Sequence, residues 1–180
     1  MSKTQYFVAA SLDGFIADVG NRIDWLLAFD GTPGLSEHYE RFLAGVGALA
    51  MGARTYQFLV EQNVPWPYAE RPTFVFTRRQ WPVVPGADIR FVDGEVSELH
   101  PQLLAAAGPR NLWLVGGGEL AAQFQRHGLI DELWLSVIPL VLGGGMSTFG
   151  RYAVSGLELE HVTPFARGIV ELRYRLEPAR

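Results

Sequence analysis

The sequence has no cysteine among its 180 residues. This absence excludes a disulfide framework, a thiolate zinc site and a cysteine nucleophile, and it is typical of proteins in a reducing compartment. Long apolar runs are also missing. No segment approaches the roughly 18 residues that a membrane-spanning helix needs, and the first apolar run, Tyr6–Ala10, is too short for the core of a signal peptide. We therefore expect a cytoplasmic protein with no membrane partner.

An excess of positive charge is missing as well. The 15 basic and 19 acidic residues give a net charge of −4, and no basic stripe appears, so we expect no nucleic-acid partner. The four histidines, His38, His100, His127 and His161, are scattered without metal-ligand spacing, so no metal site is expected. The serines lack the G-x-S-x-G elbow of a hydrolase.

The chain has the composition of a globular protein. Hydrophobic residues make up 48% and charged residues 19% of the sequence, which excludes general disorder. The length is typical of one domain that buries a sufficient core, and we expect a single domain over residues 1–180.

Short apolar runs alternate with segments of helical spacing through most of the chain. Ser36 is a candidate N-cap of the first helix. The expected strands cover 6–12, 46–51, 73–77, 89–92, 112–115 and 132–138, and the expected helices cover 36–44, 55–61, 96–104 and 119–126.

The C-terminal part has a different pattern. Apolar and charged residues alternate over 170–176, which is typical of a half-exposed antiparallel strand. Residues 157–162 are its expected hairpin partner, with a turn through 166–168. The order of elements predicts an α/β fold with a mostly parallel central sheet and antiparallel strands at the C-terminus.

The strongest local signal is the run of three glycines, Gly116, Gly117 and Gly118, between an expected strand and an expected helix. Free backbone N–H groups and the helix dipole favour a phosphate there, and glycines allow its close approach. The alternative is a tight turn that uses glycine for its conformation alone. The glycines also fit the dinucleotide fingerprint G-x-G-x-x-A, but the acidic residue expected about 20 residues later is absent, which disfavours an ordinary Rossmann dehydrogenase.

Two further signals lie just after expected strands. Arg54 and Thr55 follow Gly52, and Thr77, Arg78 and Arg79 follow another strand. Because ligands bind at the carboxyl ends of strands in open α/β sheets, one polyanionic ligand could contact all three places. Each arginine alone is more typical of a solvated surface; together they favour a phosphorylated nucleotide.

Four aspartates follow the first strand, at positions 13, 18, 24 and 30. A buried carboxylate beside a substrate can donate a proton or orient the substrate, whereas most loop aspartates only solvate turns. Asp24 precedes Trp25 and Leu26, an apolar pair that should anchor it inward. Asp30 precedes Gly31 and has the pattern of a turn residue.

Taken in order, these segments resemble the dihydrofolate reductase superfamily, in particular the branch that contains the C-terminal reductase domain of the riboflavin-biosynthesis deaminase–reductase. The resemblance covers nearly the whole chain and implies a three-layer dihydrofolate-reductase-like fold. The matching segments are 10–17, 24–26, 51–56, 76–79, 115–120 and 130–145.

The resemblance implies an NADPH-dependent reductase, and branch members are often homodimers. It places Arg54 near the adenosine 2′-phosphate and a cis peptide within the Gly-Gly run. The implied cofactor-binding residues are Ala10, Ile16, Ala17, Gly52, Arg54, Thr55, Thr77, Arg78, Val115, Gly116, Gly117, Gly118, Glu119 and Leu120.

The sequence departs from its relatives in three ways. Position 53 is Ala, where relatives often have Arg or Lys, which leaves Arg54 as the match. The deaminase signature, H-x-E with P-C-x-x-C, is absent, and the segment from Asp30 to Gly34 is typical of a turn rather than of the helix that carries the acid of folate reductases. We expect hydride transfer to a C=N or C=O of a small pterin- or ribosylamino-pyrimidine-like substrate, with Asp24 or Asp30 as the catalytic acid. The alternative is a non-catalytic nucleotide-binding protein of the same fold.

Overall fold

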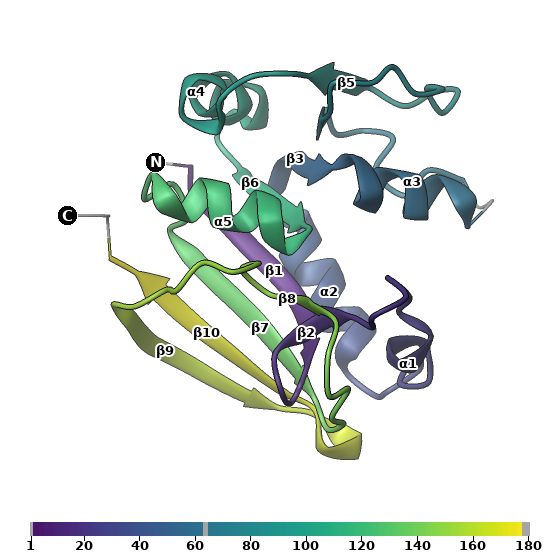
Figure 1. The fold of residues 1–180 in the computed structure, drawn as a ribbon, viewed down its shortest axis with the longest axis vertical. Coiled ribbons are helices and arrows are strands. Elements are labelled where there is room, and N and C mark those ends of the chain that lie inside the picture. Colours follow the sequence, from purple (N-terminus) through teal and green to yellow (C-terminus); the bar gives the residue numbers. More distant parts are fainter. Residues whose placement is uncertain (1, 63–64, 178–180) are drawn as a thin grey trace.

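The computed structural model describes residues 2–62 and 65–177. A twisted eight-stranded sheet forms its middle layer, with helices on both faces (Figure 1). The strands are β1 Thr4–Ser11, β2 Phe15–Ala17, β3 Val46–Gly52, β4 Thr73–Phe76, β5 Ile89–Val92, β6 Asn111–Gly116, β7 Glu132–Ile138, β8 Met146–Ser147, β9 Leu157–Pro164 and β10 Val170–Leu176. The helices are α1 Asp24–Leu27, α2 Leu35–Ala44, α3 Ala53–Glu61, α4 Val96–Ala107 and α5 Gly118–Arg126, with a 3₁₀ turn, η1, at Ala166–Gly168. No helix in these two ranges is long and apolar enough to cross a membrane.

The strand order in the large sheet is β5-β4-β3-β6-β1-β7-β10-β9, and β2 pairs with β8 in a separate two-stranded sheet. The strands from β5 to β7 run parallel, β10 runs antiparallel to β7, and β9 runs antiparallel to β10. This confirms the predicted α/β fold with a mostly parallel sheet and an antiparallel C-terminal hairpin. The order also differs from the 3-2-1-4-5-6 order of a Rossmann domain, which excludes that alternative.

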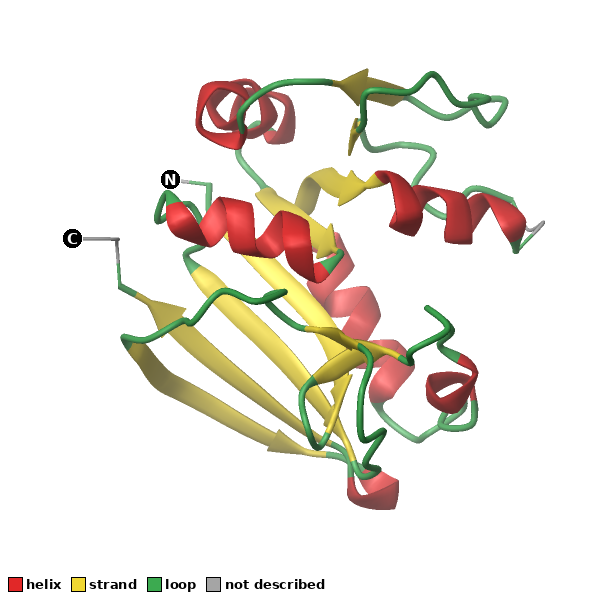
Figure 2. Ribbon diagram, viewed as in Figure 1, coloured by secondary structure: helices red, strands yellow, loops and turns green. Residues whose placement is uncertain are grey.

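Two apolar clusters hold the three layers together. On one face of the sheet, Leu103 of α4 and Phe124 of α5 pack with Tyr6 and Leu112. On the other face, Phe42 of α2 and Tyr56 of α3 pack with Trp66 and Trp113. Figure 2 shows the helices in red on either side of the yellow sheet. Because both faces of the central strands are covered, these strands are mostly apolar, and the polar residues that they do contain are at or near the strand ends, such as Thr4, Gln5 and Glu132.

Several predicted boundaries shift in the structure. Ser36 is not the N-cap of α2, so that prediction is wrong: Gly34 occupies this position with φ 85°, and no side chain caps the helix. A left-handed φ is favourable for glycine, which explains why the chain turns into the helix two residues earlier. Helix α3 likewise begins at Ala53 rather than at position 55, and α4 extends to Ala107.

The pairing predicted for the C-terminal hairpin is correct, but its polar face is exposed only in part, since Arg175 is exposed and Glu171 is buried. Glu171 on β10 is only 3% exposed, because α2 lies across this face of the sheet. The His38 Nε2 atom of α2 lies 2.7 Å from the Glu171 Oε2 atom. A period-two pattern shows which residues share a face, but not what covers that face.

Candidate functional site

The three strand ends predicted to bind phosphate lie side by side. Strands β4, β3 and β6 are neighbours in the sheet. Gly52 at the end of β3 pairs with Phe76 at the end of β4, and Met51 pairs with Gly116 at the end of β6. Arg54, Thr77 and the glycine run therefore follow the carboxyl ends of three adjacent strands, which is the edge where α/β sheets bind ligands.

The structure requires glycine at two of these three consecutive positions, and for a different reason at each. Gly116 has a φ of 126°, which L side chains rarely adopt, and the Gly116–Gly117 peptide is cis. A Cβ atom at Gly118 would lie 2.0 Å from the carbonyl oxygen of Ser147, so close packing requires glycine there. A Cβ atom at Gly117 would meet nothing nearer than 3.9 Å. Gly117 is therefore the glycine that neither its backbone angles nor its neighbours require.

The space beside Gly117 is bordered by two predicted cofactor residues. The nearest atoms to a Cβ at this position would be Ile16 Cδ1 at 3.9 Å and Thr55 Oγ1 at 4.0 Å. Gly52 lies on the same side, since a Cβ there would be 3.9 Å from both the Gly116 carbonyl oxygen and the Gly117 nitrogen. Residues from β2, α3 and the β6–α5 turn are thus brought together around one position.

Two helix N-termini face this edge of the sheet. Helix α3 begins after Gly52 and helix α5 after Gly117, and neither has a side-chain cap hydrogen bond. Amides in an uncapped first turn can bind an anion, and the helix dipole favours its negative charge. The Leu120 and Ala121 amides already donate to the Gly117 carbonyl oxygen. In α5, the amides that precede them are the candidates for ligand binding.

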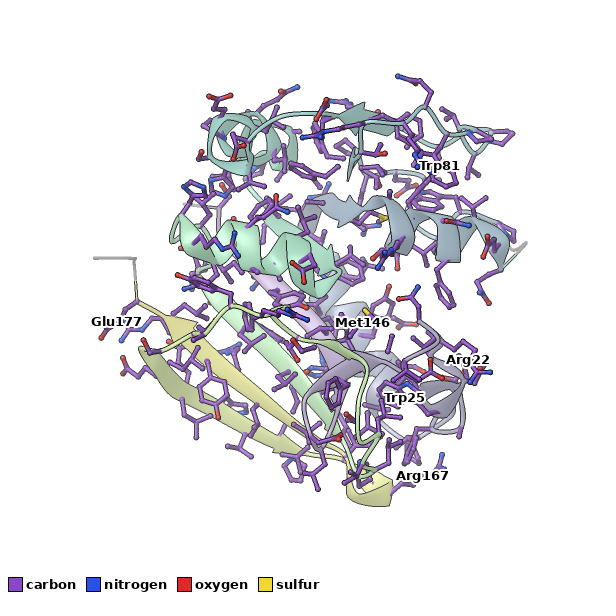
Figure 3. All side chains as sticks on the ribbon, viewed as in Figure 1. Arg22, Trp25, Trp81, Met146, Arg167 and Glu177 are labelled. Atoms are coloured by element: carbon purple, nitrogen blue, oxygen red, sulfur yellow. The ribbon has the colours of Figure 1, made fainter. Side chains whose placement is uncertain are left out.

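A cavity of about 390 Å³ adjoins α3. Its wall contains the predicted cofactor residue Arg54 and the predicted catalytic residue Asp24, together with Arg22, Gln57 and Glu61. Figure 3 shows Arg22 and Trp25 on the side of the molecule that carries α1, and Glu177 at the opposite end. The structure thus brings a cationic and an acidic candidate into one polar cavity.

The orientation predicted for Asp24 is wrong. Its side chain is exposed, because α1 is a single turn in which no residue is buried, and its first residue borders the cavity. Asp30 lies elsewhere. It is an exposed turn residue whose amide donates to the Leu27 carbonyl oxygen, and it is not part of the cavity wall. Of the two acids, Asp24 is the one that the structure places near Arg54.

The structure gives less support to the remaining residues that were predicted to bind the cofactor. Thr77 Oγ1 accepts a hydrogen bond from the Arg79 amide, and the Arg78 guanidinium forms a surface ion pair with Asp93 at 3.6 Å. The side chain of Leu120 is in the core, so only its backbone faces the turn. The others lie near the strand ends, namely Ala10 in β1, Ala17 in β2, Val115 in β6 and Glu119 in α5.

Sequence reasoning missed the role of Asp13. Its carboxylate accepts hydrogen bonds from the Ser11 hydroxyl at 2.7 Å and from the Leu142 and Gly143 amides at 3.0 and 2.8 Å. These bonds, the Ser11 bond first, lower the pKa of Asp13 below its usual value. Asp13 thus links the loop after β1 to the loop after β7. The Asp13-Gly14 pair indicated a turn, but nothing local identified a partner about 130 residues later.

Comparison with known proteins assigns the chain to a family. The RibD C-terminal domain family matches residues 2–171. The uncharacterized protein YwjB of Bacillus subtilis (strain 168) is 32% identical over 147 residues, which cover 82% of each chain. A crystal structure from Shewanella sp. PV-4, assigned by its name to riboflavin biosynthesis, is 26% identical, covers 99% of both chains and superimposes with a TM-score of 0.83.

The dihydrofolate reductase of Enterococcus faecalis, solved with NADP(H), has the same fold. It is 16% identical, covers 96% of this chain and 95% of its own, and has a TM-score of 0.64. The fold is that of the dihydrofolate-reductase-like class. Within this class, the chain belongs to the RibD C-terminal domain family.

Proposed function

We propose that this protein is an NADPH-dependent reductase that transfers a hydride to a C=N or C=O group of a small heterocyclic substrate. The observation that carries the proposal is the arrangement around Gly117. Two uncapped helix N-termini, a threonine hydroxyl and an open space meet there at the carboxyl ends of adjacent strands. This combination is suited to the pyrophosphate of a dinucleotide.

The residues around this space fit NADPH. The first amides of α3 and α5 and the Thr55 hydroxyl would hold the pyrophosphate, and Ile16, Ala10 and Ala17 would lie against the nicotinamide. In the described residues Arg54 makes no ion pair with an acidic side chain, so its guanidinium can bind the 2′-phosphate, a dianion that such a group recognises well. The bound cofactor would supply the hydride.

The substrate would lie beside the nicotinamide, in the part of the polar cavity lined by Asp24, and not at Arg54, which the 2′-phosphate would occupy. Asp24 and Gln57 on its wall can hydrogen-bond to the ring nitrogens and exocyclic groups of a pterin- or ribosylamino-pyrimidine-like molecule. Asp24 would orient this ring or relay a proton to it. An acidic group in the cavity supports the catalytic hypothesis over a non-catalytic nucleotide-binding protein, because cofactor binding alone does not require one.

The proposal is tested by titrating the protein with NADPH and NADH while recording tryptophan fluorescence and heat. We expect tight binding of NADPH, weak binding of NADH, and loss of this preference in Arg54→Gln. Removing a charge-assisted bond costs about 1.5–3 kcal/mol, or roughly ten- to a hundredfold in affinity. Arg110→Gln, at an exposed arginine before β6, serves as the matched control.

Two other results would change the conclusion. If neither nucleotide binds, the strand-end signals are structural turns and the reductase hypothesis fails. If NADPH binds but no pterin or ribosylamino-pyrimidine stimulates its oxidation, and Asp24→Asn changes nothing, the non-catalytic alternative is supported.

We also propose that the protein is a cytoplasmic homodimer of one reductase domain per chain. Strand β9 is the edge of the large sheet, and Leu157, Leu159 and Val162 on it are 38%, 51% and 48% exposed. These exposed apolar side chains on an edge strand favour contact with a second copy of the chain.

A further inference from the structure

A second cavity, of about 310 Å³, lies between α2 and the β9–β10 hairpin. It shares no wall residue with the cavity beside α3. The proposed reductase function assigns it no role. Its wall combines side chains from α2, β7, β9 and β10, so it exists only because the hairpin completes the sheet under α2.

The acidic group on this wall is already bound. The side chain of Glu171 is 3% exposed, and its Oε2 atom lies 2.7 Å from His38 Nε2. Burial raises the pKa of the Glu171 carboxyl, and the adjacent His38 opposes that change. Because His38 satisfies this carboxylate, Glu171 does not provide an open site for a cation.

The hydrogen-bond donors on the same wall have no hydrogen-bonded acceptor within the described residues. They are Arg41 of α2, His161 and Thr163 of β9, and Arg173 of β10. Across residues 2–62 and 65–177, none of these four side chains forms a hydrogen bond with an acceptor of the protein. Arg173 does form an ion pair with Glu160, but its Nε atom lies 3.8 Å from the carboxylate oxygen, which is beyond hydrogen-bond distance.

The Arg173 guanidinium is held in a fixed orientation. Its Cζ atom lies 4.7 Å from the centroid of the Trp134 ring, in cation–π geometry. The Trp134 ring is itself fixed, because its Nε1–H group donates to Glu132 at 2.9 Å. A planar guanidinium held in this way loses little entropy when it binds an oxyanion with two parallel hydrogen bonds.

We propose that this cavity is a second ligand site, which binds a phosphate group through Arg41, His161, Thr163 and Arg173. Two arginines supply the charge, and the threonine hydroxyl and the imidazole supply further donors. The phosphate could come from inorganic phosphate or from the phosphate end of a small metabolite. The site is separate from the proposed NADPH site and does not depend on it.

The test is a titration of ¹⁵N-labelled protein with inorganic phosphate and, separately, with glycerol 3-phosphate, followed by NMR. We expect saturable shifts of the Thr163 amide and the Trp134 indole signals. Tighter binding of the monoester identifies a phosphorylated metabolite as the source, and equal binding identifies free phosphate. Arg41→Gln, at an exposed position, and Thr163→Val, at a half-buried one, should each weaken binding by roughly tenfold.

Two controls separate this site from the proposed cofactor site. Arg54→Gln and Arg110→Gln should leave the Thr163 and Trp134 shifts unchanged. The proposal is overturned if the shifts do not saturate, if they occur only around Gly117, or if Arg41→Gln and Thr163→Val both bind phosphate like the wild type. None of these outcomes depends on whether the protein binds NADPH.

Discussion

Gly117 and Gly118 are adjacent, yet a methyl group at each position should have a different effect. A Cβ at Gly118 would overlap the Ser147 carbonyl oxygen at 2.0 Å, whereas a Cβ at Gly117 would enter the open space beside Thr55. We expect Gly118→Ala to lower the free energy of unfolding by about 1–3 kcal/mol, because the backbone must move. Gly117→Ala should change it by less than about 1 kcal/mol.

The same pair tests the cofactor site. Gly117→Ala should weaken NADPH binding by roughly tenfold or more, since the methyl group occupies the position proposed for the pyrophosphate. Urea unfolding gives the stability and fluorescence titration gives the affinity. If Gly117→Ala is as stable as the wild type and binds NADPH equally well, the phosphates do not lie at this turn.

At the residue scale, the sequence was most informative where local structure depends on neighbours in the chain. The glycine run and the Arg54-Thr55 pair were predicted because each follows a strand and begins a helix. The direction of Asp24 was not predictable, because it depends on where a one-turn helix packs. The role of Asp13 depends on the backbone of residues 142 and 143, which no local pattern indicates.

Helix α4 contains a histidine that should make stability depend on pH. Burial lowers the pKa of His100 below its usual value, and Asp131 opposes this only in part. Below a pH of about 6.5 the unfolded chain binds a proton at this imidazole more readily than the folded protein does. The free energy of unfolding should therefore fall as the pH falls from about 6.5 through the pKa of the folded state.

Replacement of His100 isolates this contribution. His100→Gln can keep the hydrogen bond to Thr4 Oγ1, which is 2.7 Å long in the structure, and should show a weaker loss of stability between pH 7 and pH 5. The difference in slope stays below about 1.4 kcal/mol per pH unit, because one partly exposed proton site is involved. Urea unfolding at several pH values measures it. An equal change in His127→Gln, an exposed histidine after α5, would contradict the assignment.

At the element scale, long periodic segments were predictable and very short ones were not. The β9–β10 hairpin was predicted from its alternating pattern and its turn through 166–168. Strands β2 and β8 have three and two residues, and they pair across about 130 positions. Such a pairing comes from the tertiary structure, because neither segment is long enough to show a period.

For the whole molecule, the proposed homodimer makes the outer edge of the sheet a sensitive position. A double replacement, Leu159→Lys with Val162→Lys, should convert a dimer into a folded monomer, because lysines on an edge strand oppose pairing with a second copy. Light scattering after size exclusion measures the mass. Val83→Lys, at an exposed valine far from β9 in the sequence, should leave the mass unchanged. A wild-type protein that is already monomeric at high concentration would refute the dimer.

Because β1 lies in the centre of the sheet, the sheet can form around it only after β6 and β7 have been synthesised. Its neighbours are β6 and β7, so that Thr4 pairs with Leu112 and Ser11 with Ile138. Strand β1 therefore leaves the ribosome well before either of its two partners, and contacts this distant in sequence form slowly. A chain that stops before Glu132 leaves one side of an apolar strand unpaired. We expect such fragments, once released, to sediment as aggregates.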